Sequence, residues 1–172
     1  ANRTSKIHAE HFEAFASYNY PALAISGVHL VVNEEALLPI PKVERPLIVH
    51  KELNPNVLIL KMFPGISEDL VKHVFSYPKL EGIVLGSGNL TDEVWFLNAL
   101  RELIASGVHV VNVTQCSGGS VIMGLYETSV EMMKMGVISG KDLTSEAAVV
   151  KMMWLLGQNI SPKSFKTFFG AS

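Results

Sequence analysis

The chain has 172 residues, a length that suits one domain, or one domain with part of another. Hydrophobic residues make up 48% and charged residues 17%, which excludes a disordered chain and provides enough apolar side chains for a core. The net charge of −2 without a basic run argues against a nucleic-acid partner, and no apolar run approaches the roughly 18 residues of a membrane-spanning helix. The single cysteine, Cys116, excludes an internal disulfide and suits a reducing compartment.

The first third of the chain has weak local signals. Apolar residues at roughly helical spacing predict a partly helical segment, and residues 28–32 alternate like a short strand. The helical signal consists of Ala9, Phe12, Phe15 and Ala16. Residues 33–56 hold four prolines with charges between them, and we interpret them as a linker or peripheral segment. Because the chain begins with alanine rather than methionine, we expect it to be a piece of a longer protein.

From residue 57 onward, strand and helix patterns alternate. Ser67 and Thr144 stand where helix N-caps are expected, each followed by acidic residues or apolar periodicity. The expected strands are 57–62, 82–85 and 108–113, with a short strand or turn at 136–140. The expected helices are 67–77, 92–106, 126–135, 144–157 and one that opens at 161–162. This alternation predicts an α/β fold with a parallel, doubly wound sheet.

A polar loop, residues 114–120, follows the apolar β-branched strand 108–113. In open α/β sheets, ligands bind outside the carboxyl ends of the strands, so this loop is a candidate site on physical grounds alone. Cys116 lies in it, and the two interpretations of that residue are a structural thiol and a reactive one.

Two other patterns carry weaker chemical signals. The stretch from Gly86 to Thr91 has the context of a dinucleotide loop but lacks its third glycine, and a tight turn explains both glycines. His8 and His11 are one helical turn apart, but two ligands without a third make a weak metal site.

Several motifs together resemble one family. They are Asn-Arg-Thr-Ser-Lys at 2–6, Val-Asn-Val-Thr-Gln-Cys at 111–116, Tyr-Glu-Thr at 126–128 and the stretch 136–148. This combination resembles the C-terminal domain of the cytoplasmic (type I) L-asparaginases. The resemblance implies the end of an N-terminal asparaginase domain at 1–32, a linker at 33–56 and a C-terminal domain at 57–172. It implies no cofactor or metal.

The resemblance gives Lys6 a catalytic role, as the lysine of the family's Thr–Lys–Asp triad. A lysine acts as a base only where burial and neighbouring charges favour its neutral form. The family's threonine motifs, Thr-Gly-Gly-Thr-Ile-like and His-Gly-Thr-Asp-Thr-like, do not occur in this chain. We therefore expect this chain alone to be inactive, with the nucleophilic threonine on a missing N-terminal half.

The resemblance also implies binding residues. Asn89, Tyr126 and Glu127 match positions that reach the active site of a neighbouring subunit and hold L-asparagine, although Glu127 alone reads equally well as an exposed helix carboxylate. Cys116, Ser5 and Thr114 match a possible allosteric asparagine site, with Thr114 equally interpretable as a loop-stabilising residue. A homodimer or a dimer of dimers is expected.

A second function from another class stays open at this point. The chain also suits a non-catalytic module that keeps the fold for ligand binding or assembly. A related alternative is the asparaginase-like subunit of a tRNA-dependent amidotransferase.

Overall fold

The computed structural model describes residues 2–44, 46–87, 93–124 and 127–170. Its body is a four-stranded parallel sheet in the order β5-β6-β7-β8. Val57, Gly82 and His109 are in register at its amino end. The strands are β5 (Val57–Lys61), β6 (Gly82–Gly86), β7 (His109–Val113) and β8 (Ile138–Ser139).

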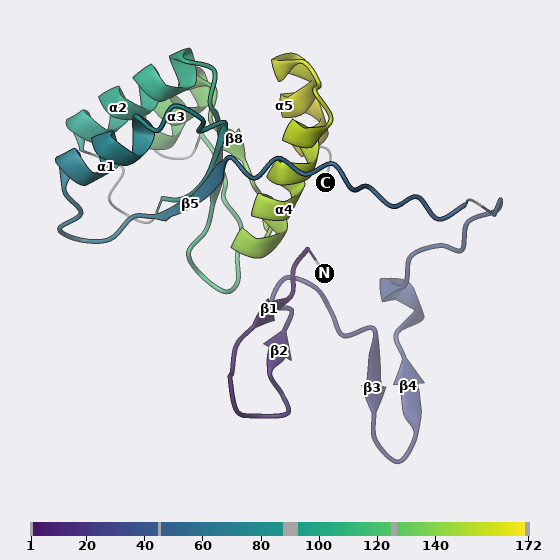
Figure 1. Ribbon diagram of the computed structural model, residues 1–172. Coiled ribbons are helices and arrows are strands. Elements are labelled where there is room, and N and C mark those ends of the chain that lie inside the picture. Colours follow the sequence, from purple (N-terminus) through teal and green to yellow (C-terminus); the bar gives the residue numbers. More distant parts are fainter. Residues whose placement is uncertain (1, 45, 88–92, 125–126, 171–172) are drawn as a thin grey trace.

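Helices cover both faces of the sheet (Figure 1). One apolar cluster joins the sheet to the helices on one side, and a second cluster joins it to the last two helices on the other side. The parallel sheet between two helical layers confirms the predicted α/β fold class. The first layer is α1 (Glu68–Phe75), α2 (Val94–Ala105) and α3 (Glu127–Met135), and the second is α4 (Ser145–Gly157) and α5 (Pro162–Gly170).

Strand β6 lies at the centre of the core. All five of its residues are buried, because α2 covers one face and α4 the other. Gly82 has to be glycine, since an added Cβ would lie 2.4 Å from Sδ of Met152 in α4. A strand buried on both faces reads as a continuous apolar run, as Ile83 to Leu85 does.

Both predicted N-caps are confirmed. The Ser67 hydroxyl accepts a hydrogen bond from the Leu70 amide at 3.3 Å, and the Thr144 hydroxyl accepts one from the Ala147 amide at 3.2 Å. Each bond satisfies an N–H group that the first turn of a helix otherwise leaves unpaired. These caps place the starts of α1 and α4 where local residue types alone indicated.

The N-terminal segment stands apart from this body as two antiparallel hairpins (Figure 1). The partly helical segment predicted over residues 9–16 is wrong, because residues 9–14 form bends and a loop, and Phe15–Ala16 is a strand. Phe12 and Phe15 are exposed, so their helical spacing has no core face to pack against. The strands are β1 (Ser5–Lys6), β2 (Phe15–Ala16), β3 (Ala24–Ser26) and β4 (Leu30–Val32).

Residues 33–56 connect the hairpins to β5 and carry one short 3-10 helix, η1 (Glu34–Ala36), in their described part. The end of the connection is held against α4: the Asn54 amide donates to the Met153 carbonyl at 2.9 Å. A Cβ on Gly157 would lie 2.4 Å from the Glu52 carbonyl oxygen, so glycine is required there. No helix in the described part of the chain is long and apolar enough to cross a membrane.

The Thr144 cap gives a first prediction. Thr144→Ala should lower the free energy of unfolding by about 1 kcal/mol in urea titrations, because an amide in the first turn of α4 loses its acceptor. Thr144→Ser keeps the hydroxyl oxygen and should change stability much less. Equal losses in both variants would assign the effect to the lost methyl group instead.

His109 gives a second prediction, on pH. Burial lowers the pKa of His109, with a smaller opposing effect from Glu81, and the ring stacks on Phe165 with centroids 4.0 Å apart. A lowered pKa means that the folded state favours neutral imidazole. This contribution is complete above the unfolded value of about 6.5 and is lost as pH falls through the folded value.

Urea titrations between pH 7.5 and 5 should therefore show a steeper loss of stability for the native chain than for His109→Phe. Phenylalanine keeps an aromatic ring against Phe165 and removes the titration. Parallel stability curves for the two proteins would show that His109 does not contribute to the pH dependence.

Candidate active site

The carboxyl ends of the parallel strands meet at one edge of the sheet, and we call this the carboxyl edge. The chain leaves β5 at Met62, β6 at Ser87, β7 at Thr114 and β8 at Gly140. Ligands of open α/β sheets bind at this edge. The polar loop 114–120 lies here, where the sequence predicted a candidate site.

Gln115 joins three of the strand ends. Its Nε2 donates to the carbonyl of Met62 at 2.8 Å and to the carbonyl of Gly86 at 2.7 Å. The first carbonyl follows β5 and the second ends β6, whereas Gln115 itself follows β7. Residue types alone did not single out this contact, because its partners lie 53 and 29 positions away.

Asn112 is a polar residue in an otherwise apolar strand. It is 3% exposed, and its Oδ1 has no hydrogen-bond partner among the described residues. Its Nδ2 has a long contact of 3.9 Å with Sδ of Met123. An unsatisfied buried carbonyl costs free energy, so the residue marks a place where function outweighs stability. The signal in the sequence was a lone polar residue at the end of a β-branched run.

The N-terminal segment reaches the carboxyl edge through polar contacts. The Asn19 side chain donates to the Gly119 carbonyl at 2.7 Å and accepts from the Gly119 amide at 2.8 Å. Arg3 forms an ion pair with Asp142, and this pairing holds the pKa of the Asp142 carboxyl below its usual range. Residues 100 or more positions apart thus share one side of the molecule.

Lys6 and Ser5 lie on β1, in register with Phe15 and Ala16 of β2. The Lys6 side chain is exposed, and Ser5 is half-buried. Beside them, the Thr4 and Ser17 hydroxyls are 2.8 Å apart. The motif therefore sits on the segment that is tied to the carboxyl edge. The described residues leave Lys6 without the burial that a catalytic base requires.

The other predicted site residues have different outcomes. Cys116 is exposed with a free thiol, and its amide donates to the Thr114 hydroxyl at 3.0 Å, so Thr114 does stabilise the loop. Glu127 is exposed at the first position of α3. Asn89 and Tyr126 lie outside the described residues.

The two histidines near the N-terminus are stacked, with ring centroids 3.8 Å apart. Nδ1 of His8 accepts hydrogen bonds from the amides of Glu10 and His11, at 3.1 and 3.2 Å. This nitrogen is already occupied by backbone groups. No cluster of three or more metal-ligating side chains occurs in the described part of the chain.

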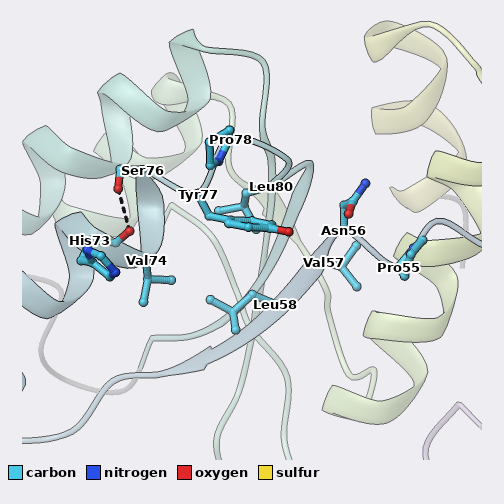
Figure 2. Close-up of a pocket in the computed structure, with 10 residues that line it drawn as sticks. All are labelled: Pro55, Asn56, Val57, Leu58, His73, Val74, Ser76, Tyr77, Pro78 and Leu80. Atoms are coloured by element: carbon cyan, nitrogen blue, oxygen red, sulfur yellow. Dashed lines mark hydrogen bonds between the residues drawn. The ribbon is translucent and has the colours of Figure 1, made fainter.

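A hollow of about 520 Å³ lies between α1 and the amino half of β5 (Figure 2). Leu58, Val74 and Tyr77 point into it, with His73 at its rim. It is distant from the carboxyl edge in the chain's topology, because β5 enters the sheet there. Its polar lining is partly paired within the chain: the Ser76 hydroxyl donates to the His73 carbonyl at 2.8 Å. We therefore assign the candidate site to the carboxyl edge.

The geometry above coincides with a match to a known family. The model of the glutaminase/asparaginase C-terminal domain matches residues 56–169. The chain belongs to the glutaminase/asparaginase family. This match covers the whole parallel sheet and both helical layers.

Individual relatives of this family member give its extent. L-asparaginase 1 of Escherichia coli K12 is 38% identical over 168 residues, which are 96% of this chain and 49% of the relative. The 60 kDa lysophospholipase of Mus musculus is 39% identical over 91% of this chain and 28% of its own length. The crystal structure of L-asparaginase I from Vibrio cholerae superimposes with a TM-score of 0.86 at 34% identity, over 99% of this chain and 52% of that one. The chain thus spans about half the length of the L-asparaginases it matches.

The ion pair at the carboxyl edge gives a third prediction. Asp142→Asn should raise the rate of tryptic cleavage after Lys6 about threefold, because the N-terminal segment loses a partly exposed ion pair worth under about 1 kcal/mol. Asp69→Asn, in the first turn of α1, is the matched control and should leave the rate unchanged. Equal rates in all three proteins would show that Arg3 and Asp142 do not hold the segment.

Proposed function

We propose that this chain is the C-terminal portion of an L-asparaginase, which hydrolyses L-asparagine to L-aspartate and ammonia. The observation that carries the proposal is the 38% identity to L-asparaginase 1, which extends over 96% of this chain. In the proposed division, residues 1–32 end an N-terminal domain, 33–56 form the linker and 57–172 form the C-terminal domain. The family match over residues 56–169 supports the last boundary.

The apolar surface of residues 7–49 supports a partner for this segment. These residues expose large hydrophobic side chains, among them Leu47 at 91% exposed. A hollow of about 740 Å³ lies in the same segment, between β1, β2 and η1. Continuous apolar surface of this kind marks an interaction site. In the proposal, the missing N-terminal half covers it. The other members are Ile7, Phe12, Phe15, Tyr18, Leu23, Ile25, Val28, Leu30, Val31, Val32, Leu37, Leu38, Ile40, Val43, Ile48 and Val49.

The proposed reaction begins with a threonine of the N-terminal half. Lys6 takes the proton of its hydroxyl, and the oxygen attacks the side-chain amide carbon of asparagine. Ammonia leaves, and water then releases L-aspartate from the acyl-enzyme. Because Lys6 is exposed in this chain, the same cover that buries the apolar segment has to desolvate it. The reaction needs no cofactor or metal.

The proposed substrate contacts come from the carboxyl edge. Asn89, Tyr126 and Glu127 hold asparagine in the site of a neighbouring subunit, with Glu127 pairing the α-ammonium group. A homodimer, or a dimer of dimers, follows from this arrangement. Ser5, Thr114 and Cys116 form the proposed allosteric asparagine site. The free thiol is consistent with the proposed location in the cytoplasm.

A fourth prediction tests the enzyme assignment. The chain alone should release no ammonia from asparagine, whereas the chain joined behind the N-terminal half of L-asparaginase 1 of E. coli should do so. In the joined protein, Lys6→Met should lower kcat by at least about a hundredfold, because the general base is lost. Lys79→Met, at another exposed lysine, is the matched control and should keep the activity.

Two results would contradict this assignment. One is ammonia release by the isolated chain at an enzymatic rate, and the other is an active Lys6→Met protein. The alternative is a non-catalytic ligand-binding module, which the match within the longer lysophospholipase favours. Calorimetry that detects asparagine binding to an inactive joined protein would support that alternative.

A further inference from the structure

The amide of Gln115 is held in one orientation by two carbonyl groups. A primary amide has two N–H donors on its nitrogen and an acceptor on its oxygen. Nε2 lies 2.8 Å from the Met62 oxygen and 2.7 Å from the Gly86 oxygen, and only the NH₂ side of the amide can donate to both. Gln115 therefore works as a clamp across the ends of β5, β6 and β7.

The clamp is close-packed at Gly86. An added Cβ there would lie 3.0 Å from Cγ of Gln115 and 3.5 Å from Cγ of Lys61. The Gly86 oxygen also accepts from the Met62 amide at 3.0 Å, so two donors hold it. A side chain at position 86 would displace Gln115, which explains glycine here better than a tight turn alone does.

The restraint extends past the end of β6. The Gly86 carbonyl and the Ser87 amide belong to one planar peptide group, so holding the oxygen also sets the direction in which the chain continues. Asn89 follows only two residues later. We propose that Gln115 is a positioning residue that sets the start of the connection from β6 to α2 and, through it, the placement of Asn89. The consequence for substrate rests on the proposed function of Asn89.

The first experiment measures the clamp in this chain itself. Gln115→Met keeps the length of the side chain and removes both donors. In hydrogen–deuterium exchange, peptides that cover Met62 and Gly86–Ser87 should exchange about fivefold faster, since a hydrogen bond of this kind contributes about 1 kcal/mol. Unchanged exchange in these peptides would overturn the proposal.

The matched control is another glutamine that bridges two carbonyls. Gln158 donates through Nε2 to the Glu52 and Trp154 carbonyls, at 3.4 and 3.2 Å, at the C-terminus of α4. Gln158→Met should leave exchange at Met62 and Ser87 at the native rate. Equal acceleration by both variants would indicate general loosening of the fold and would overturn the assignment to Gln115.

The second experiment measures the consequence for substrate, in the joined enzyme described above. Gln115→Met should raise KM for asparagine about fivefold with a smaller change in kcat, and Gln115→Glu should raise it further, because a carboxylate would face two carbonyl oxygens. If Gln115 acts through Asn89, the effect should vanish in an Asn89→Ala background. A KM that stays at the native value, or an effect that persists in that background, would overturn the positioning role. A joined native protein without activity would instead contradict the proposed function, and the exchange experiment would still decide whether the clamp exists.

Discussion

The rest of the structure depends on the burial of β6 on both of its faces. Ile83, Val84 and Leu85 are fully buried, and each contributes about 1.5–3 kcal/mol by leaving water. One helical layer cannot cover both faces, so the chain has to place helices on each side of the sheet. The three crossovers between β5 and β8 provide the first layer, and α4 and α5 provide the second.

This arrangement brings the carboxyl ends of the strands together and leaves their loops to make a site. Backbone hydrogen bonds hold the strands in register, but they end where the strands end. Beyond that point the ends are joined by side chains, and Gln115 is the residue that spans three of them. Asn112 lies at the same edge with an unsatisfied oxygen, a cost that a purely structural strand would avoid.

The N-terminal segment follows a different physical logic. It is attached to the carboxyl edge by polar contacts of Arg3 and Asn19, while its apolar side chains face solvent. Polar contacts at a surface contribute little stability, so the free energy available from covering the apolar side chains exceeds what these contacts supply. Together with the half-length match to L-asparaginases, this imbalance supports the proposal that a further domain completes the protein.

Local residue patterns determined the elements from residue 57 onward. The β/α alternation, the Ser67 and Thr144 caps and the buried face of α2 all depend on residues within a few positions of one another, so the sequence predicts them directly. The motif around Lys6 likewise indicated the family, which the match over residues 56–169 confirms.

Tertiary structure decided what depends on distant partners. The helix predicted over residues 9–16 is replaced by a hairpin strand, because local spacing carries no information on whether a core face exists to receive it. The Gln115 clamp, the Arg3–Asp142 pair and the Asn19–Gly119 bonds each join residues that the fold alone brings together. Strand order and register set these contacts, and no local pattern encodes either one.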